Sequence, residues 1–193
     1  EILIGLVGSE MCIRDRNNKK QTLCLRKGFL FWNYGRKSSK EKHMTRSNAR
    51  EIACHLVFEM NFNNITAGEA LQTLMDDGYY PTLKTETDVY AEKPDGKQLE
   101  YLTSVVQGVQ AKREELEGYI SKYSVGWSLG RIARMAVAIM EVCMYEALYI
   151  DDAPVSAAIN EAVELTRKYE NEDVVSFVNG ILGGFARQME QPC

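Results

Sequence analysis

Proline and histidine are scarce in this sequence of 193 residues, which holds 4 prolines and 2 histidines. So little proline argues against a linker-rich or collagen-like chain. The 5 cysteines lie far apart and form no CxxC pair, which argues against both a zinc site and a disulfide framework. Unpaired cysteines suit a reducing compartment, so we expect a cytoplasmic protein.

Long hydrophobic runs are also missing. No apolar stretch approaches the ~20 residues that a membrane-spanning helix needs. The opening EILIGLVG is too short to span, and it lacks the basic flank and the small-residue cleavage site of a signal peptide. We therefore expect no membrane partner. The length and the hydrophobic content of 45% still suffice for a domain with a real core.

The charge is divided unevenly along the chain. Residues 1–43 hold 10 Lys/Arg and 4 Asp/Glu, a net +6, whereas residues 44–193 hold 13 and 23, a net −10. A basic arm on an acidic body usually suggests a nucleic-acid tail. However, residues 6–16 read LVGSEMCIRDR, which resembles the translated sequence of a transposase adapter from sequencing libraries.

The rest of the first 43 residues shows neither a period of 3.6 nor a period of 2. Lys40-Glu41 can be encoded by a bacterial ribosome-binding sequence, at a short spacing before Met44. We therefore predict that residues 1–43 are a non-native, disordered extension, and that the natural chain starts at Met44. The alternative is a genuine disordered basic arm.

Residues 44–193 carry helical patterns and no strand patterns. Apolar residues recur at helical spacing, and caps are expected at Ser47, at Thr66 with Glu69 in a capping box, and at Asp173. The polar stretch 79–97 is expected to be a loop. The pattern predicts an all-α bundle with helices over about 47–63, 67–76, 97–122, 128–150, 154–169 and 174–189, the fourth of which is apolar nearly all round and therefore central.

No constellation of residues predicts an enzyme, a metal site or a cofactor. His55 is the only histidine after Met44, and it has no cysteine or carboxylate at ligand spacing, which favours a structural role. The glycines of 180–184 lack the lysine and hydroxyl residue of a phosphate loop. We expect no catalytic residue and no cofactor.

Two surface features do predict binding. Phe58 and Phe62 are one turn apart and lie roughly opposite the core stripe of the first helix, so they either pack under the 79–97 loop or form a partner surface. Phe177 lies near the start of the last helix, where free backbone N–H groups favour anions. An aromatic ring beside such a helix start suits single-stranded RNA, although Phe177 also fits a core-edge position.

These residues resemble the bacterial NusB family of transcription antitermination factors. The strongest matches are AINEAVEL at 158–165, Lys168-Tyr169, and FVNGIL at 177–182, in the order and at the spacing of the family signatures. Further matches are Trp127-Ser128-Leu129, Met144-Tyr145-Glu146 and the opening Thr45-Arg46. The resemblance covers Met44 to about Arg187. It implies about six to seven helices in two packed three-helix sub-bundles, and no enzymatic activity.

The resemblance also implies partners and site residues. The family pairs with ribosomal protein S-ten (NusE), binds boxA RNA and acts with RNA polymerase in antitermination, notably in ribosomal RNA operons. RNA-binding positions are implied at Arg46, Arg50, Lys168, Asp173, Ser176, Phe177 and Asn179, and positions facing NusE at Phe58, Phe62 and Ala136. The sequence departs from the family at Ala136, which is often acidic, and at Glu141, which is usually arginine.

Two other functions are compatible with such a bundle. One is the helical targeting domain of a ribosomal RNA methyltransferase, which would need a catalytic domain with a Gly-rich cofactor loop. The other is a helical protein–protein adaptor with weak or no RNA binding, which the acidic body and the small number of arginines favour.

Overall fold

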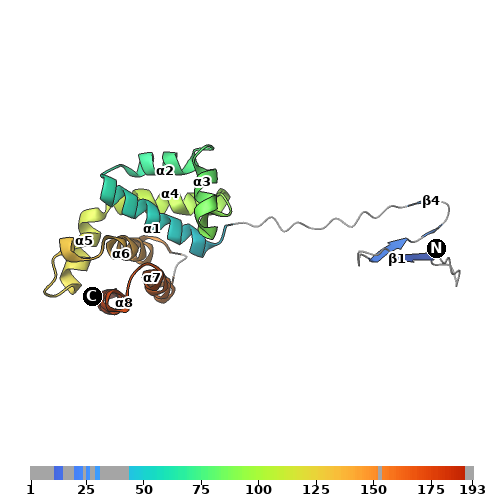
Figure 1. Ribbon diagram of the computed structural model, residues 1–193. Coiled ribbons are helices and arrows are strands. Elements are labelled where there is room, and N and C mark those ends of the chain that lie inside the picture. Colours follow the sequence, from blue (N-terminus) through green and yellow to red (C-terminus); the bar gives the residue numbers. More distant parts are fainter. Residues whose placement is uncertain are drawn as a thin grey trace. The chain divides into compact units, whose positions relative to one another are not determined.

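The computed structural model describes residues 11–14, 20–23, 25–26, 29–30, 44–151 and 154–189. The chain divides into two compact units, Glu1–Glu41 and Lys42–Cys193. The helices that the structure describes all belong to the second unit (Figure 1). None of the described helices is long and apolar enough to cross a membrane.

The described residues of the first unit form four short strands. β1 (Met11–Arg14) pairs antiparallel with β2 (Lys20–Leu23), and β3 (Leu25–Arg26) pairs antiparallel with β4 (Phe29–Leu30). No period of 2 marks these short strands in the sequence, and the prediction of a disordered extension stays a prediction. The other residues of 1–43 lie outside the described residues, and the foreign origin of this segment stays a prediction.

The second unit begins with one group of helices, α1–α4. Its members are α1 (Arg46–Asn63), α2 (Ala67–Met75), α3 (Tyr80–Glu86), the 3₁₀ turn η1 (Asp88–Tyr90) and α4 (Gly96–Ala111). The capping box of Thr66 and Glu69 is confirmed. The cap of α1 is Thr45 rather than Ser47, because the Thr45 hydroxyl accepts a hydrogen bond from the Asn48 N–H at 3.1 Å.

The stretch 79–97 is not only a loop, since it contains α3 and η1. Pro81 lies in the first turn of α3, where a missing N–H costs nothing. Tyr80 and Tyr90 are both buried and pack edge to face, with 6.0 Å between their ring centroids. The segment is too short and too polar to show a helical period, and these two tyrosines fold it onto the core.

The second group of helices, α5–α8, follows. Its members are α5 (Arg113–Tyr123), the 3₁₀ turn η2 (Leu129–Arg131), α6 (Arg134–Tyr149), α7 (Val155–Tyr169) and α8 (Glu172–Met189). The single helix predicted over 97–122 is broken at Lys112, where φ is −110° and ψ is 13°. The break has a packing reason, because α4 packs mainly on α1 whereas α5 packs on α6 and α8.

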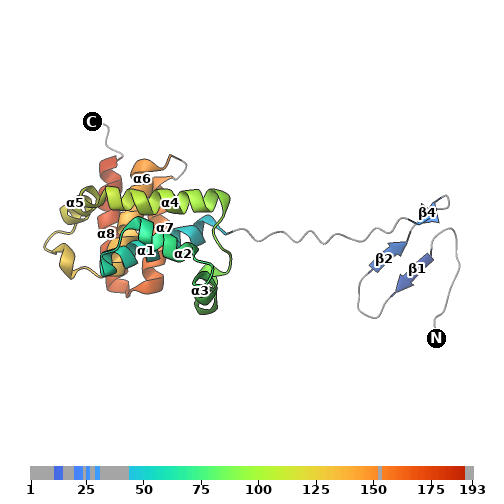
Figure 2. The same cartoon turned by 90° about the horizontal axis from the view of Figure 1, so that it is seen from above.

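Helix α6 is the central helix, as its apolar pattern predicts. It packs against α1, α4, α5, α7 and α8, and ten of its residues are buried (Figure 2). It begins at Arg134, later than the predicted start near Trp127. It crosses α4 closely at Gly108, where an added Cβ would lie 2.0 Å from Cζ of Tyr145. Two carboxylates, Glu141 and Glu146, are buried within it.

The all-α architecture of the predicted fold is confirmed for residues 44–151 and 154–189. The groups α1–α4 and α5–α8 are packed together mainly through α1 and α6 (Figures 1 and 2). Each group contains four α-helices instead of the three expected, because α3 was not predicted and the third helix is split.

Candidate functional site

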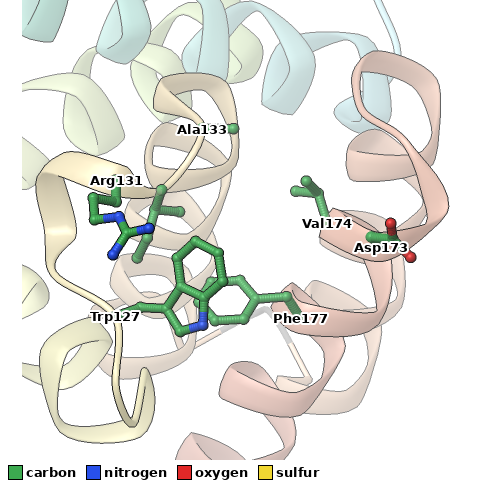
Figure 3. Close-up of a pocket in the computed structure, with 7 residues that line it drawn as sticks. Trp127, Arg131, Ala133, Asp173, Val174 and Phe177 are labelled. Carbon is green, nitrogen blue, oxygen red and sulfur yellow. The ribbon is translucent and has the colours of Figure 1, made fainter.

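A small pocket lies between the start of α8 and the turn that precedes α6. Its volume is about 140 Å³, and its lining consists of Trp127, Arg131, Ile132, Ala133, Asp173, Val174 and Phe177. The rings of Trp127 and Phe177 approach each other from the two sides, with centroids 5.8 Å apart and planes tilted by 56° (Figure 3). The Arg131 guanidinium lies 5.3 Å from the Trp127 ring centroid. The pocket thus combines two aromatic faces with a cation.

The turn before α6 presents Trp127 to solvent. Gly126 has a φ of +80°, a conformation that favours glycine, and the Trp127 N–H donates to the Ser124 carbonyl at 3.0 Å. The buried Ile132 anchors the end of the segment. Trp127 itself is 51% exposed, so its ring is available to a ligand.

The start of α8 differs in one detail from the sequence prediction. Asp173 is not the cap, because the Asn171 side-chain oxygen accepts the hydrogen bond from the Val174 N–H at 3.1 Å. Asp173 lies in the first turn and is exposed. Ser176 and Asn179 are also exposed on α8, while Phe177 is half-buried at the edge of the core.

Arg50, one of the predicted RNA contacts, points into the protein. Its Nε and Nη2 donate to the two carboxylate oxygens of Glu146 at 2.6 and 3.0 Å, and its Nη1 donates to Glu161 at 3.2 Å. The residue is only 8% exposed. All three guanidinium nitrogens are bonded within the protein and the residue is nearly buried, so the arrangement does not fit a direct RNA contact by Arg50.

Arg46 is the exposed arginine at the start of α1. Its guanidinium stacks over Tyr101, 4.0 Å from the ring centroid. The Tyr101 hydroxyl donates to Glu146 at 2.8 Å, the carboxylate that also binds Arg50. Burial raises the pKa of Tyr101 well above its usual range, so this hydroxyl stays a donor. The stacking on Tyr101 therefore orients Arg46 at the surface, and the hydrogen bond to Glu146 fixes Tyr101.

Lys168 belongs to a chain of hydrogen bonds that includes His55. Lys168 donates to the buried Glu51 carboxylate at 2.5 Å, and the Tyr169 hydroxyl donates to the same oxygen. The Tyr169 oxygen is then free to accept from Nε2 of His55 at 2.7 Å, while Nδ1 accepts from Tyr90 at 2.7 Å. Burial lowers the pKa of His55. This geometry agrees with the structural role predicted for His55.

Phe58 and Phe62 form a second exposed feature on α1. Their rings stack with centroids 5.9 Å apart and an angle of 14°, and the Arg134 guanidinium lies 5.1 Å from the Phe62 centroid. Phe62 is 60% exposed, so the segment 79–97 does not cover it. We call Phe58, Phe62 and Arg134 the α1 aromatic face.

Ala136, predicted to face the partner, is fully buried in α6 with 0% exposure. It offers no surface to a second protein, so the prediction that Ala136 contacts NusE directly is wrong. Its neighbour Arg134, two residues earlier on the exposed side of α6, reaches the α1 aromatic face instead.

Comparisons with known proteins agree with this architecture. The NusB family profile matches residues 47–187. The chain belongs to the NusB family. A relative from Acetivibrio thermocellus, named transcription antitermination protein NusB, is 36% identical over 72% of this chain and 87% of its own. The protein of the same name from Clostridium tetani is 36% identical over 76% of this chain and 100% of its own.

Solved NusB structures have the same fold. NusB from T. maritima is 25% identical and superposes with a TM-score of 0.59, over 76% of this chain and 94% of that one. A chain from the crystal structure of antitermination factors NusB and NusE in complex with dsRNA gives a TM-score of 0.59 at 19% identity, over 74% and 96%. The similarity to the C. tetani protein extends over the whole length of that protein.

Membership of the NusB family identifies an antitermination factor and not an enzyme. Within the helical part that the structure describes, no three His, Cys, Asp or Glu side chains gather where they could hold a metal ion. Cys54 and Cys143 are buried and free, and burial raises the pKa of both thiols, so they are inert core residues.

The structure brings together some of the predicted NusB site residues and adds others. Asp173 and Phe177 line the pocket, and Ser176 and Asn179 lie exposed on the same helix. Trp127 and Arg131 were not predicted as site residues. Little in the sequence indicates either residue, because a tryptophan near a predicted helix start is equally compatible with a place in the core. The exposure of Trp127 depends on the turn at Gly126.

Proposed function

We propose that this protein binds boxA-type RNA together with ribosomal protein S-ten (NusE), and that it supports ribosomal RNA transcription by RNA polymerase in the cytoplasm. The observation that carries the proposal is the aromatic pocket at the start of α8, where Trp127 and Phe177 converge beneath Arg131. Aromatic faces that stack unpaired bases, combined with a nearby cation for phosphate, are a recurring arrangement in single-strand binding.

The proposed RNA surface extends over α8 and its surroundings. Trp127 and Phe177 supply stacking faces, and Ser176 and Asn179, on either side of Phe177 in the sequence of α8, supply exposed hydrogen-bonding groups. The phosphate backbone is assigned to the exposed cations, namely Arg46, Arg131 and Lys168. Residues 44–193 carry a net −10, so their long-range field repels RNA and the affinity must come from such local contacts.

Arg50 has an indirect role in this proposal. Its ion pair with Glu146 fixes the first turns of α1 on α6, and Tyr101, which orients Arg46, is bonded to the same carboxylate. Arg50 is thus a positioning residue for the exposed Arg46 rather than a contact to RNA.

The proposed S-ten surface is the α1 aromatic face. Two stacked phenyl rings, one of them 60% exposed, with a guanidinium beside them, match the aromatic and arginine composition of protein–protein hot spots. The solved complex of NusB and NusE with dsRNA, one chain of which has this fold, supports both partners by analogy.

Co-purification of the full chain with S-ten, followed by a gel-shift titration, tests the proposal. We expect the complex to shift boxA RNA at lower protein concentration than a scrambled RNA of equal length. Capture of S-ten without any RNA shift, at low as well as moderate salt, would favour the adaptor function instead. Failure to capture S-ten would contradict the partner assignment.

A further inference from the structure

Asn61 of α1 and Glu141 of α6 meet where the two helix groups are packed together. The Asn61 side-chain nitrogen donates to Oε2 of Glu141 at 2.9 Å. The two remaining oxygens, Oδ1 of Asn61 and Oε1 of Glu141, are buried and have no hydrogen-bond partner within the described part of the chain. Buried acceptors without a partner are rare and costly. A single proton between these two oxygens would satisfy both.

We propose that Glu141 is a neutral carboxylic acid in the folded protein, and that its Oε1–H donates to Oδ1 of Asn61. Together with the observed bond from the Asn61 nitrogen to Oε2, this closes a two-bond acid–amide ring between α1 and α6. Each group then donates once and accepts once, which leaves no unpaired acceptor in the pair.

The surroundings favour the neutral form. The Glu141 side chain is fully buried, and burial is the main cause that raises its pKa from 4.5 to about 7. The charged groups that act on it come from α5: Arg113 lowers its pKa and Glu117 raises it. These two pair with each other at 3.8 Å, so neither is a dedicated counter-ion for Glu141. On α6 itself, Arg134 points to the ring of Phe62.

The pair lies beside the α1 aromatic face. Asn61 precedes Phe62 in α1, and it lines a pocket of about 260 Å³ together with Arg113, Glu117 and Arg134. Loss of the proton would leave a buried carboxylate next to the amide oxygen of Asn61. The packing of α6 against the end of α1 would then be less stable. If the proposed S-ten surface is correct, and only then, S-ten binding should weaken with rising pH as well.

The expected effect on stability has a definite sign. The pKa of Glu141 is higher in the folded protein than in the unfolded chain, so the folded state holds the proton more tightly. The stabilisation is complete at pH values below about 4.5, and it is lost as the pH rises through about 7.

Thermal unfolding of the full chain at pH 5.5 and pH 8 tests the inference without S-ten. Glu141→Gln keeps an acceptor and a permanent donor, so we expect its melting temperature relative to that of the parent protein to be higher at pH 8 than at pH 5.5. Glu100→Gln, which removes an exposed carboxylate of α4 that does not act on Glu141, is the matched control and should follow the parent protein at both pH values. A relative melting temperature of Glu141→Gln that is equal at the two pH values, or lower at pH 8, would overturn the inference.

A direct titration covers the case in which Glu141→Gln does not fold. The side-chain carboxyl ¹³C signal that is missing in a Glu141→Asp variant assigns Glu141 in the unaltered protein. A midpoint near pH 7 supports the shared proton. A midpoint near the ordinary value of 4.5 would show an ionised, solvated carboxylate and would overturn it, whatever the outcome of the RNA and S-ten experiments.

Discussion

Arg50 donates hydrogen bonds to both carboxylate oxygens of the buried Glu146, a residue 96 positions further along the chain. The pair ties the first turns of α1 to the central helix, with Glu161 of α7 as a third member at 3.2 Å. An arginine in an N-terminal segment expected to bind RNA thus serves first to assemble the fold.

Truncation of Arg50 should therefore act on stability. Arg50→Ala leaves the Glu146 carboxylate buried with only the Tyr101 hydroxyl as a partner, and such loss of one member of a buried pair typically costs ~3–5 kcal/mol. We expect a clear fall in the denaturation midpoint. Arg46→Ala is the matched control, since Arg46 is exposed; it should fold normally, weaken all RNAs and flatten the salt dependence by about one unit. If Arg50→Ala kept normal stability and lost RNA binding, Arg50 would be an RNA contact and not a structural residue.

The aromatic pocket should contribute stacking energy. Trp127→Ala and Phe177→Ala are each expected to lose ~1–3 kcal/mol of RNA binding, because each removes one stacking face. Trp127 is 51% exposed, so its removal should leave the melting temperature nearly unchanged, whereas the half-buried Phe177 should also lose some stability. Fluorescence anisotropy with labelled RNA measures the effect, and Tyr149→Ala, an exposed aromatic at the end of α6, is the control. Equal losses for Tyr149→Ala would mean that the effect is not local to the pocket.

The charge of Asp173 should oppose RNA. Asp173 lies at the pocket in the first turn of α8, but Asn171 supplies the cap. Asp173→Asn is thus expected to tighten RNA binding at low salt, and to cost at most the ~0.3–1 kcal/mol that a carboxylate gains from a helix start. Asn171→Ala should instead cost about 1 kcal/mol of stability through the lost cap. Salt titrations and chemical denaturation distinguish the two; equal or weaker RNA binding by Asp173→Asn would place the RNA elsewhere.

The α1 aromatic face should anchor S-ten. Phe62→Ala removes a ring that is 60% exposed, so the fold should remain intact while S-ten binding weakens by ~2 kcal/mol or more. Calorimetric titration with S-ten measures the loss. Tyr79→Ala, another exposed aromatic in the same helix group, should bind S-ten normally. Unaltered binding by Phe62→Ala would exclude this face as the anchor.

The sequence predicted those features whose causes are local. The capping box of Thr66 and Glu69 and the apolar pattern of α6 depend on residues a few positions apart, and both are confirmed. Features that depend on distant partners were missed. The inward direction of Arg50 is decided by Glu146, and the folding of the segment 79–97 by the packing of Tyr80 on Tyr90 and the core.

The predicted site was incomplete for the same reason. Phe177 could be identified because it stands at a helix start, but Trp127 joins it only through a turn that no periodic pattern marks. Ala136 was assigned by resemblance, and its burial follows from the packing of α6 on five neighbouring helices.

The close crossing at Gly108 restricts the order in which substitutions can accumulate. Any Cβ at position 108 would overlap the Tyr145 ring, which also packs on Tyr149 with centroids 5.0 Å apart. Removal of the hydroxyl alone gives no relief, because the ring carbon Cζ is itself 2.0 Å from the added atom. A side chain at position 108 therefore requires Tyr145 to move or to be replaced by a smaller residue, so we expect the effects of substitutions at the two positions to depend on each other.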